Sequence, residues 1–281
     1  MAMGLNELAL NEWIEIDSNY RTEIEQKRHL LTERFADVFA AQPGSESGGR
    51  EALELLTTHL AQRFPNWFAR DGAQFTNALT GEVWDLQNPP LHPLDLAARC
   101  VQEDLCLMQE RGGVYVLAAA SVCFPSRWKL RDKIGAPMRA IHAPVPFYDD
   151  KIGAASDRFL TLLAPEKPVW RINWSLHDSP ELFQPEAAPP AIGSEKITAE
   201  NAGDWLWLRA ERQTLRRLPS SGDILFTIRT YVRPLRDYAT REHAAALAEA
   251  LRNFPPETIA YKGLRGQIDA AVKFLEGSGI S

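Results

Sequence analysis

The stretch that decides the fold is residues 205–232, WLWLRAERQTLRRLPSSGDILFTIRTYV. It begins with an apolar run that ends in charged residues, 205–212, and closes with a β-branched and aromatic run, 224–232. The intervening residues 218–223, LPSSGD, are of the types that form turns. Alternate residues of the second run separate into two sets, as on the two faces of a strand. The stretch therefore predicts two strands joined by a turn.

Three further segments have the character of strands. Residues 104–109 and 114–124 flank the glycine-containing sequence ERGG, which predicts a hairpin. Residues 169–176, VWRINWSL, predict another strand. Turns or long insertions separate these strands, without a regular alternation of strands and helices. This pattern favours an α+β fold with a mostly antiparallel sheet over a doubly wound parallel sheet.

Helical segments are expected on both sides of these strands. The loop QPGSESGG is expected over 42–49. We expect a mainly helical N-terminal region (1–82), a sheet region (83–235) and C-terminal helices (236–281), together forming one compact unit. The individual helices are predicted from apolar spacing, caps and proline breaks over 17–41, 50–63, 93–98, 242–251 and 257–275.

Composition limits the class of protein. The chain has 281 residues, with 31 Lys+Arg against 37 Asp+Glu, so its formal net charge is -6. This balance disfavours a nucleic-acid binder, and the ordinary apolar content excludes intrinsic disorder. The three cysteines, Cys100, Cys106 and Cys123, lack CxxC spacing and predict reduced, mostly buried thiols. No secretory signal and no apolar run of roughly 18 residues is seen, so a cytoplasmic location is expected.

Several common catalytic signatures are absent from the sequence. It contains no GxGxxG, Walker A, GxSxG or HExxH pattern. A nucleotide-phosphate enzyme, an α/β-hydrolase and a zinc protease are therefore disfavoured.

The segment 122–148 is the first candidate site. It places five cations within 13 residues, 127–139, and continues into IHAPVP, which contains His142. Two prolines within four residues of His142 are expected to stiffen the backbone and prevent a helix. A histidine on such a loop suits an axial metal ligand, which must be neutral and held in one orientation. Spacing alone favours the alternative, a histidine that hydrogen-bonds a neighbouring loop.

The second candidate site is RAERQTLRR, residues 209–217. If the strand continues, Arg209, Glu211 and Gln213 share one face and Arg212 lies on the other. Clustered guanidinium groups predict an anion site. A solvated edge strand with salt bridges is the commoner explanation for such a run. Arg229, on the next strand, is expected to face this cluster and thereby supports the anion site.

The strand 169–176 and the remaining histidines are less distinctive. The alternating aromatic residues of 169–176 predict a strand with two different faces, one of which packs tryptophans into the core. His177, at the end of this strand, is a reserve ligand candidate. The other four histidines, His29, His59, His92 and His243, are interpreted as structural or surface residues.

Five ordered segments of the chain resemble the DUF3445 family, which includes haem-dependent oxidative N-demethylases and the haem subunit of dimethylamine monooxygenase. The likeness runs from about Ile14 to Leu235. The segments are VQEDL (101–105), FPSRW (124–128), IHAPVP (141–146), RINW (171–174), and ERQTLRRLP (211–219) continuing to TIRTY (227–231).

This resemblance implies a haem b held by a histidine in a PAS-like fold. The ligand role falls on His142, with His177 as the fallback. It also implies that NADPH supplies electrons through a separate flavin and iron–sulfur reductase, that O2 is the co-substrate, and that a small methylated amine is oxidised with release of formaldehyde. Nucleic-acid and membrane partners are not expected.

Chemistry suggests the remaining site residues. A cationic amine calls for a buried carboxylate, for which Glu211 and Asp104 are the candidates. Arg212, Arg216 and Arg229 are the candidates for the haem propionates. Two alternatives remain at this point: a non-catalytic haem-binding PAS-like sensor, and a binding module for a small anion.

Overall fold

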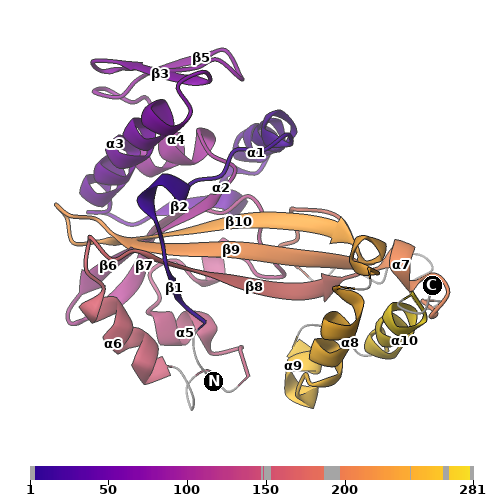
Figure 1. Cartoon of the computed structure of the whole chain (residues 1–281). Coiled ribbons are helices and arrows are strands. Elements are labelled where there is room, and N and C mark those ends of the chain that lie inside the picture. The colour runs from indigo at the N-terminus through magenta and orange to yellow at the C-terminus, as the bar shows by residue number, and fades with distance from the viewer. Residues whose placement is uncertain are drawn as a thin grey trace.

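The structure, a computed structural model, is organised around a seven-stranded sheet in which every neighbouring pair of strands is antiparallel (Figure 1). This confirms the predicted α+β class, and the PAS-like description stays a prediction. The residues described are 4–146, 148, 153–186, 197–240, 242–261 and 266–278. In spatial order the strands are β1 (Asn6–Glu7), β8 (Val169–His177), β9 (Trp207–Arg217), β10 (Ile224–Pro234), β6 (Asp104–Arg111), β7 (Val114–Ser121) and β2 (Phe39–Ala41).

The predicted hairpin over 205–232 forms the centre of this sheet as β9 and β10, which are 11 residues each. Strand β9 begins at Trp207 and runs through the arginine-rich segment to Arg217, so it starts later and ends later than predicted. In the register of the hairpin, Glu211 faces Thr230 and Arg212 faces Arg229. The second predicted hairpin, β6 and β7, turns at Gly112 and Gly113, with φ of 62° and 87°, a backbone conformation that favours glycine.

The two faces of the sheet bury different parts of the chain. One face is covered by α3 (Glu46–Arg63) and is called the α3 face; the other is covered by α5 (Met138–His142) and is called the α5 face. The α3 face carries the even-numbered residues of β8 and β9, and the α5 face carries the odd-numbered ones. Leucines of β6 and β10 on the α3 face pack against leucines of α3 (Glu46–Arg63) and α4 (Pro93–Arg99). On the α5 face, β6, β7, β9 and β10 pack against α5 (Met138–His142) and α6 (Ala154–Leu162). Figure 1 shows α3 and α4 above the sheet, and α5 and α6 below it.

The N-terminal region differs from the sequence-based prediction. The helix expected over 17–41 is divided into α1 (Tyr20–Glu33), α2 (Phe35–Val38) and the edge strand β2. The expected loop over 42–49 already contains the first turn of α3. Its glycines allow a close approach, because a Cβ on Gly48 would lie 2.0 Å from Asp223 Oδ2. A separate three-stranded sheet, β3 (Phe68–Asp71), β4 (Gln74–Asn77) and β5 (Glu82–Asp85), was not expected in a mainly helical region.

The C-terminal helices pack around the far ends of β8, β9 and β10 (Figure 1). The segment predicted as one helix over 257–275 falls on α9 (Pro256–Tyr261) and α10 (Ile268–Ser278), and residues 262–265 between them lie outside the described residues. Within the described ranges, the helices are too short or too polar to span a membrane. The helices of this region are α7 (Ala202–Trp205), α8 (Ala244–Arg252), α9 (Pro256–Tyr261) and α10 (Ile268–Ser278).

Candidate functional site

His142 lies at the end of α5, so the prediction that the adjacent prolines prevent a helix was wrong. Proline restricts its own backbone and that of the residue before it. Pro144 therefore constrains Ala143 but leaves residues 138–142 free to turn. Pro137 stands at the N-cap position, where its missing N–H costs nothing.

The imidazole of His142 has the electronic state that a metal ligand needs. Its Nδ1 lies 3.0 Å from the carbonyl oxygen of Met138. Because a carbonyl oxygen only accepts, this contact places the proton on Nδ1 and the lone pair on Nε2. Burial lowers the pKa of His142, and the nearby cations Lys133 and Arg171 act in the same direction, against the raising effect of the Met138 hydrogen bond. The ring is therefore neutral at pH 7.

A chain of hydrogen bonds crosses the α5 face from Arg171 to Glu211. Arg171 Nε donates to Gln213 Oε1 over 2.8 Å, and Gln213 Nε2 donates to Glu211 Oε2 over 3.0 Å. Asn173 Nδ2 also donates to Glu211 Oε2, over 3.2 Å. We call these four residues the Glu211 network. Arg171 belongs to this network and also acts on the pKa of His142, so the imidazole and the carboxylate occupy one face of the sheet.

Arg209 is the buried neighbour of Glu211 in this network. Its side chain is 1% exposed, and its Nε lies 3.7 Å from Glu211 Oε1. The two terminal nitrogens donate to backbone carbonyls, Nη2 to Phe124 over 2.5 Å and Nη1 to Leu182 over 3.1 Å. The guanidinium is thereby fixed beside the Glu211 carboxylate. The outer end of the network is open, because Asn173 is exposed.

Asp104, the second predicted carboxylate, is fully buried at the start of β6. It accepts hydrogen bonds from the backbone N–H groups of Cys123 and Phe124, over 2.8 and 2.9 Å. Burial raises the pKa of Asp104 to about 6, while the cation Lys27 and these N–H donors act in the opposite direction. Both oxygens thus fix the chain where it leaves β7.

The three arginines predicted to bind haem propionates lie on the α3 face, across the sheet from His142. Arg229 is fully buried and pairs with Glu23 at 2.7 Å and Asp17 at 2.8 Å. Arg212 donates to the carbonyl oxygens of Glu12 and Trp13. Arg216 stacks over the ring of Trp13, 4.3 Å from its centroid. These contacts anchor the N-terminal segment to the sheet, and the propionate role stays a prediction.

His177, the fallback ligand, uses both ring nitrogens in hydrogen bonds. Nε2 lies 2.8 Å from Ser175 Oγ, and Nδ1 lies 3.0 Å from Gln184 Oε1. The side chain is buried on the same face as Arg209. Its environment is that of a structural histidine.

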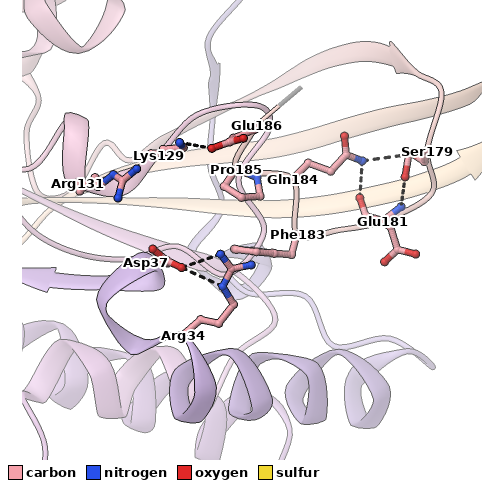
Figure 2. A pocket seen from close by; sticks show the side chains of 10 residues that line it. All are labelled: Arg34, Asp37, Lys129, Arg131, Ser179, Glu181, Phe183, Gln184, Pro185 and Glu186. Carbon is pink, nitrogen blue, oxygen red and sulfur yellow. Dashed lines mark hydrogen bonds and ion pairs between the residues drawn. The ribbon is translucent and has the colours of Figure 1, made fainter. Parts of the chain in front are cut away.

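A cavity of about 470 Å³ opens beside the basic segment 127–139 (Figure 2). Two of its cations are already neutralised, because Arg34 pairs with Asp37 and Lys129 pairs with Glu186. Arg34 also stacks over Phe183, 4.7 Å from the ring centroid. This cavity therefore has little unpaired positive charge to offer an anion.

Sequence reasoning missed several residues of the site. The pattern of the strand predicts only a polar side for Arg171 and Asn173, and it predicts for Gln213 only the face that it shares with Arg209 and Glu211. Tyr148, whose ring stacks on His142, was not singled out. The alternation of side chains along each strand predicts which residues of that strand share a face. Only the register between β8 and β9 shows that Arg171 lies opposite Gln213 and Asn173 lies opposite Glu211.

A comparison with protein families supplies the identity of the chain. Residues 4–272 match the model of one family, described as haem-dependent oxidative N-demethylase, alpha subunit-like. The match includes every residue of the Glu211 network as well as His142, Tyr148 and Arg209. This span is most of the chain, and it agrees with the resemblance carried by the five sequence segments. The chain belongs to the family of haem-dependent oxidative N-demethylase alpha subunit-like proteins.

Proposed function

We propose that the protein is a haem-dependent monooxygenase that removes a methyl group from a small methylated amine and releases it as formaldehyde. The observation that carries this proposal is the placement of a neutral imidazole and a fixed carboxylate on one face of the sheet. Family membership supports the dependence on haem. In the overall reaction one oxygen atom of O2 enters a methyl C–H bond, and the other leaves as water after uptake of two electrons and two protons.

The residues around His142 fit a haem. Nε2 would offer its lone pair to the iron, and the hydrogen bond from Nδ1 to the Met138 carbonyl fixes the ring, as is usual for metal-binding histidines. Arg171, partly exposed near His142, is suited to a propionate. The apolar cluster of α5, α6 and the sheet supplies the dry surroundings. When bound, haem supplies the redox chemistry with O2, using electrons from a separate flavin and iron–sulfur reductase fed by NADPH.

Glu211 provides the counter-charge for the substrate ammonium group. Taking this cation out of water is costly unless an opposite charge compensates for it. Hydrogen bonds from Asn173 and Gln213 hold the carboxylate in one position, so little reorganisation accompanies binding. Asp104 remains the second candidate, although both of its oxygens already accept backbone N–H groups.

The cysteines are consistent with a cytoplasmic location. Cys100, Cys106 and Cys123 are free and buried. Thiols of this kind persist in a reducing compartment. We therefore propose a cytoplasmic location.

The test is an absorption spectrum of the full chain expressed with haem supplementation, before and after dithionite and then with CO. We expect a Soret band that shifts on reduction and shifts again with CO. With NADPH and a flavin and iron–sulfur reductase, dimethylamine should then yield formaldehyde. A folded protein without a Soret band would rule out this function. A haem spectrum without amine-dependent formaldehyde would favour the sensor alternative.

A further inference from the structure

Two buried polar atoms beside Glu211 have no hydrogen-bond partner among the described residues. They are Arg209 Nε and Thr230 Oγ1. Both residues are 1% exposed. An unpaired polar group at this depth destabilises the fold, so such atoms usually have a partner in the native protein.

The strand register places both residues next to Glu211. Thr230 of β10 is directly opposite Glu211 of β9, and both side chains lie on the α5 face. Cross-strand neighbours have Cβ atoms about 4.5–5.5 Å apart. Glu211 Oε2 already accepts from Asn173 and Gln213, whereas Oε1 faces Arg209 Nε over 3.7 Å. That separation is an ion-pair distance and is too long for a direct hydrogen bond, so Arg209 Nε keeps an unused donor beside Oε1.

The chemistry of the three atoms restricts what can join them. Arg209 Nε only donates, Glu211 Oε1 as a carboxylate only accepts, and Thr230 Oγ1 can do either. The bridging group must therefore accept one hydrogen bond and donate another. An ammonium ion cannot accept, and a fully ionised anion cannot donate. Water does both, and three partners are its usual number when buried.

We propose that Arg209 Nε, Glu211 Oε1 and Thr230 Oγ1 form a binding site for one ordered water molecule. Its catalytic role rests on the proposed function. The substrate ammonium gives its N–H proton to this water, and the water gives a different proton to Glu211 Oε1. The water is unchanged, Glu211 becomes neutral, and the amine nitrogen gains the lone pair that its oxidation requires. Thr230 acts here as a positioning residue for the water.

The first test compares Thr230→Val with the unaltered full chain, in a high-resolution crystal structure and in thermal unfolding. We expect a solvent peak within hydrogen-bonding distance of all three atoms, and we expect the valine variant to lose it. The melting temperature of the variant should fall by about 3 °C, since Arg209 and Glu211 then lack their bridge. A Thr230 hydroxyl bonded to a backbone carbonyl, with an unchanged or higher melting temperature in the variant, would overturn the water site.

A vibrational measurement tests whether the water contacts Glu211. The carboxylate band that disappears in Glu211→Gln belongs to Glu211, and its frequency should shift in Thr230→Val. Thr227→Val is the matched control. Thr227 lies on the same strand but on the α3 face, bonded to Thr214 at 2.7 Å, so this variant should leave the band in place. Equal shifts in both variants would contradict the proposal.

Kinetics separate the water site from the proposed function. In the haem-loaded protein with its reductase, Thr230→Val should lower kcat for formaldehyde release about tenfold, leave KM unchanged and alter the solvent deuterium isotope effect. Unchanged kcat and isotope effect would overturn the proton-transfer role. If the unaltered protein releases no formaldehyde but shows the solvent peak and the band shift, the water site is supported and the demethylase function fails.

Discussion

The ring of Tyr148 lies face to face with the imidazole of His142, with centroids 4.6 Å apart and an angle of 11° between the planes. The Met138 carbonyl of α5 accepts the hydrogen bond of Nδ1 and fixes the direction of the ring within its plane. The stacked Tyr148 ring fixes the tilt of that plane. This arrangement prepares the orientation of Nε2 before a ligand binds.

Replacement of Tyr148 by leucine should weaken haem binding about fivefold. The aromatic contact is worth about 1 kcal/mol, and without it the imidazole gains rotational freedom. Titration of the haem-free chain with haemin measures the change. Tyr115→Leu is the control, because Tyr115 on the same face stacks with Arg217 instead of His142. Equal losses in both variants would remove any specific role for Tyr148.

His142→Ala should lower haem affinity by at least about a hundredfold and abolish the native Soret band, since the ligand itself is lost. Added imidazole should restore the band. His177→Ala should keep the band and cost about 1–3 kcal/mol of unfolding free energy, because Ser175 and Gln184 lose a buried partner. The reverse pattern would assign the iron to His177.

Arg171→Gln should weaken haem binding about tenfold without moving the Soret band, because a propionate would lose its cation while the histidine ligand would be kept. Arg216→Gln should leave haem affinity unchanged, since the Arg216 guanidinium lies over Trp13 on the α3 face. Haem titration of the two variants decides between them. A loss of haem affinity in Arg216→Gln alone would support the sequence-based prediction that Arg216 binds a haem propionate.

Arg229→Met should destabilise the fold by about 3–5 kcal/mol in urea unfolding, because it leaves the Glu23 carboxylate buried without its cation. Adding Glu23→Gln should recover part of this loss. If the single variant unfolds like the unaltered chain, the buried ion pair does not anchor α1 to the sheet.

His59 should make the fold sensitive to acid. Burial, together with the cation Arg216, lowers the pKa of His59 to about 4 in the folded chain, from an ordinary 6.5. Between these pH values the unfolded chain binds more protons, so stability falls as the pH drops from 6.5 towards 4. After allowance for partial exposure the loss is about 2 kcal/mol.

The measurement for His59 is the difference in unfolding free energy between pH 7 and pH 4.5, with and without His59→Phe. The variant should have the shallower dependence on pH, since phenylalanine keeps the ring contact with Trp13 and cannot bind a proton. Parallel pH profiles would assign the acid sensitivity to other groups.

Strands β6 to β10 of the central sheet were predictable because their signals are local, whereas the short edge strands β1 and β2 were not predicted. Side chains alternate with period two, and Gly112, Gly113 and Gly222 mark the hairpin turns. The same alternation correctly placed Arg209, Glu211 and Gln213 together, and Arg212 on the other face. The helix at Met138–His142 was not predicted, because Pro144 restricts only Ala143 and itself and not the residues before Ala143.

The sequence by itself thus determined the hairpins, the antiparallel class and the sharing of faces within each strand. Only the tertiary structure decided what covers each face. Arg229 and Arg212 face each other as expected, but on the side where Asp17, Glu23 and the Trp13 carbonyl approach from about 200 residues away. His142 lies on the opposite side, with Arg171 and Glu211. A strand's alternation is fixed by local backbone geometry, whereas its covering layer depends on contacts between segments that are distant in sequence.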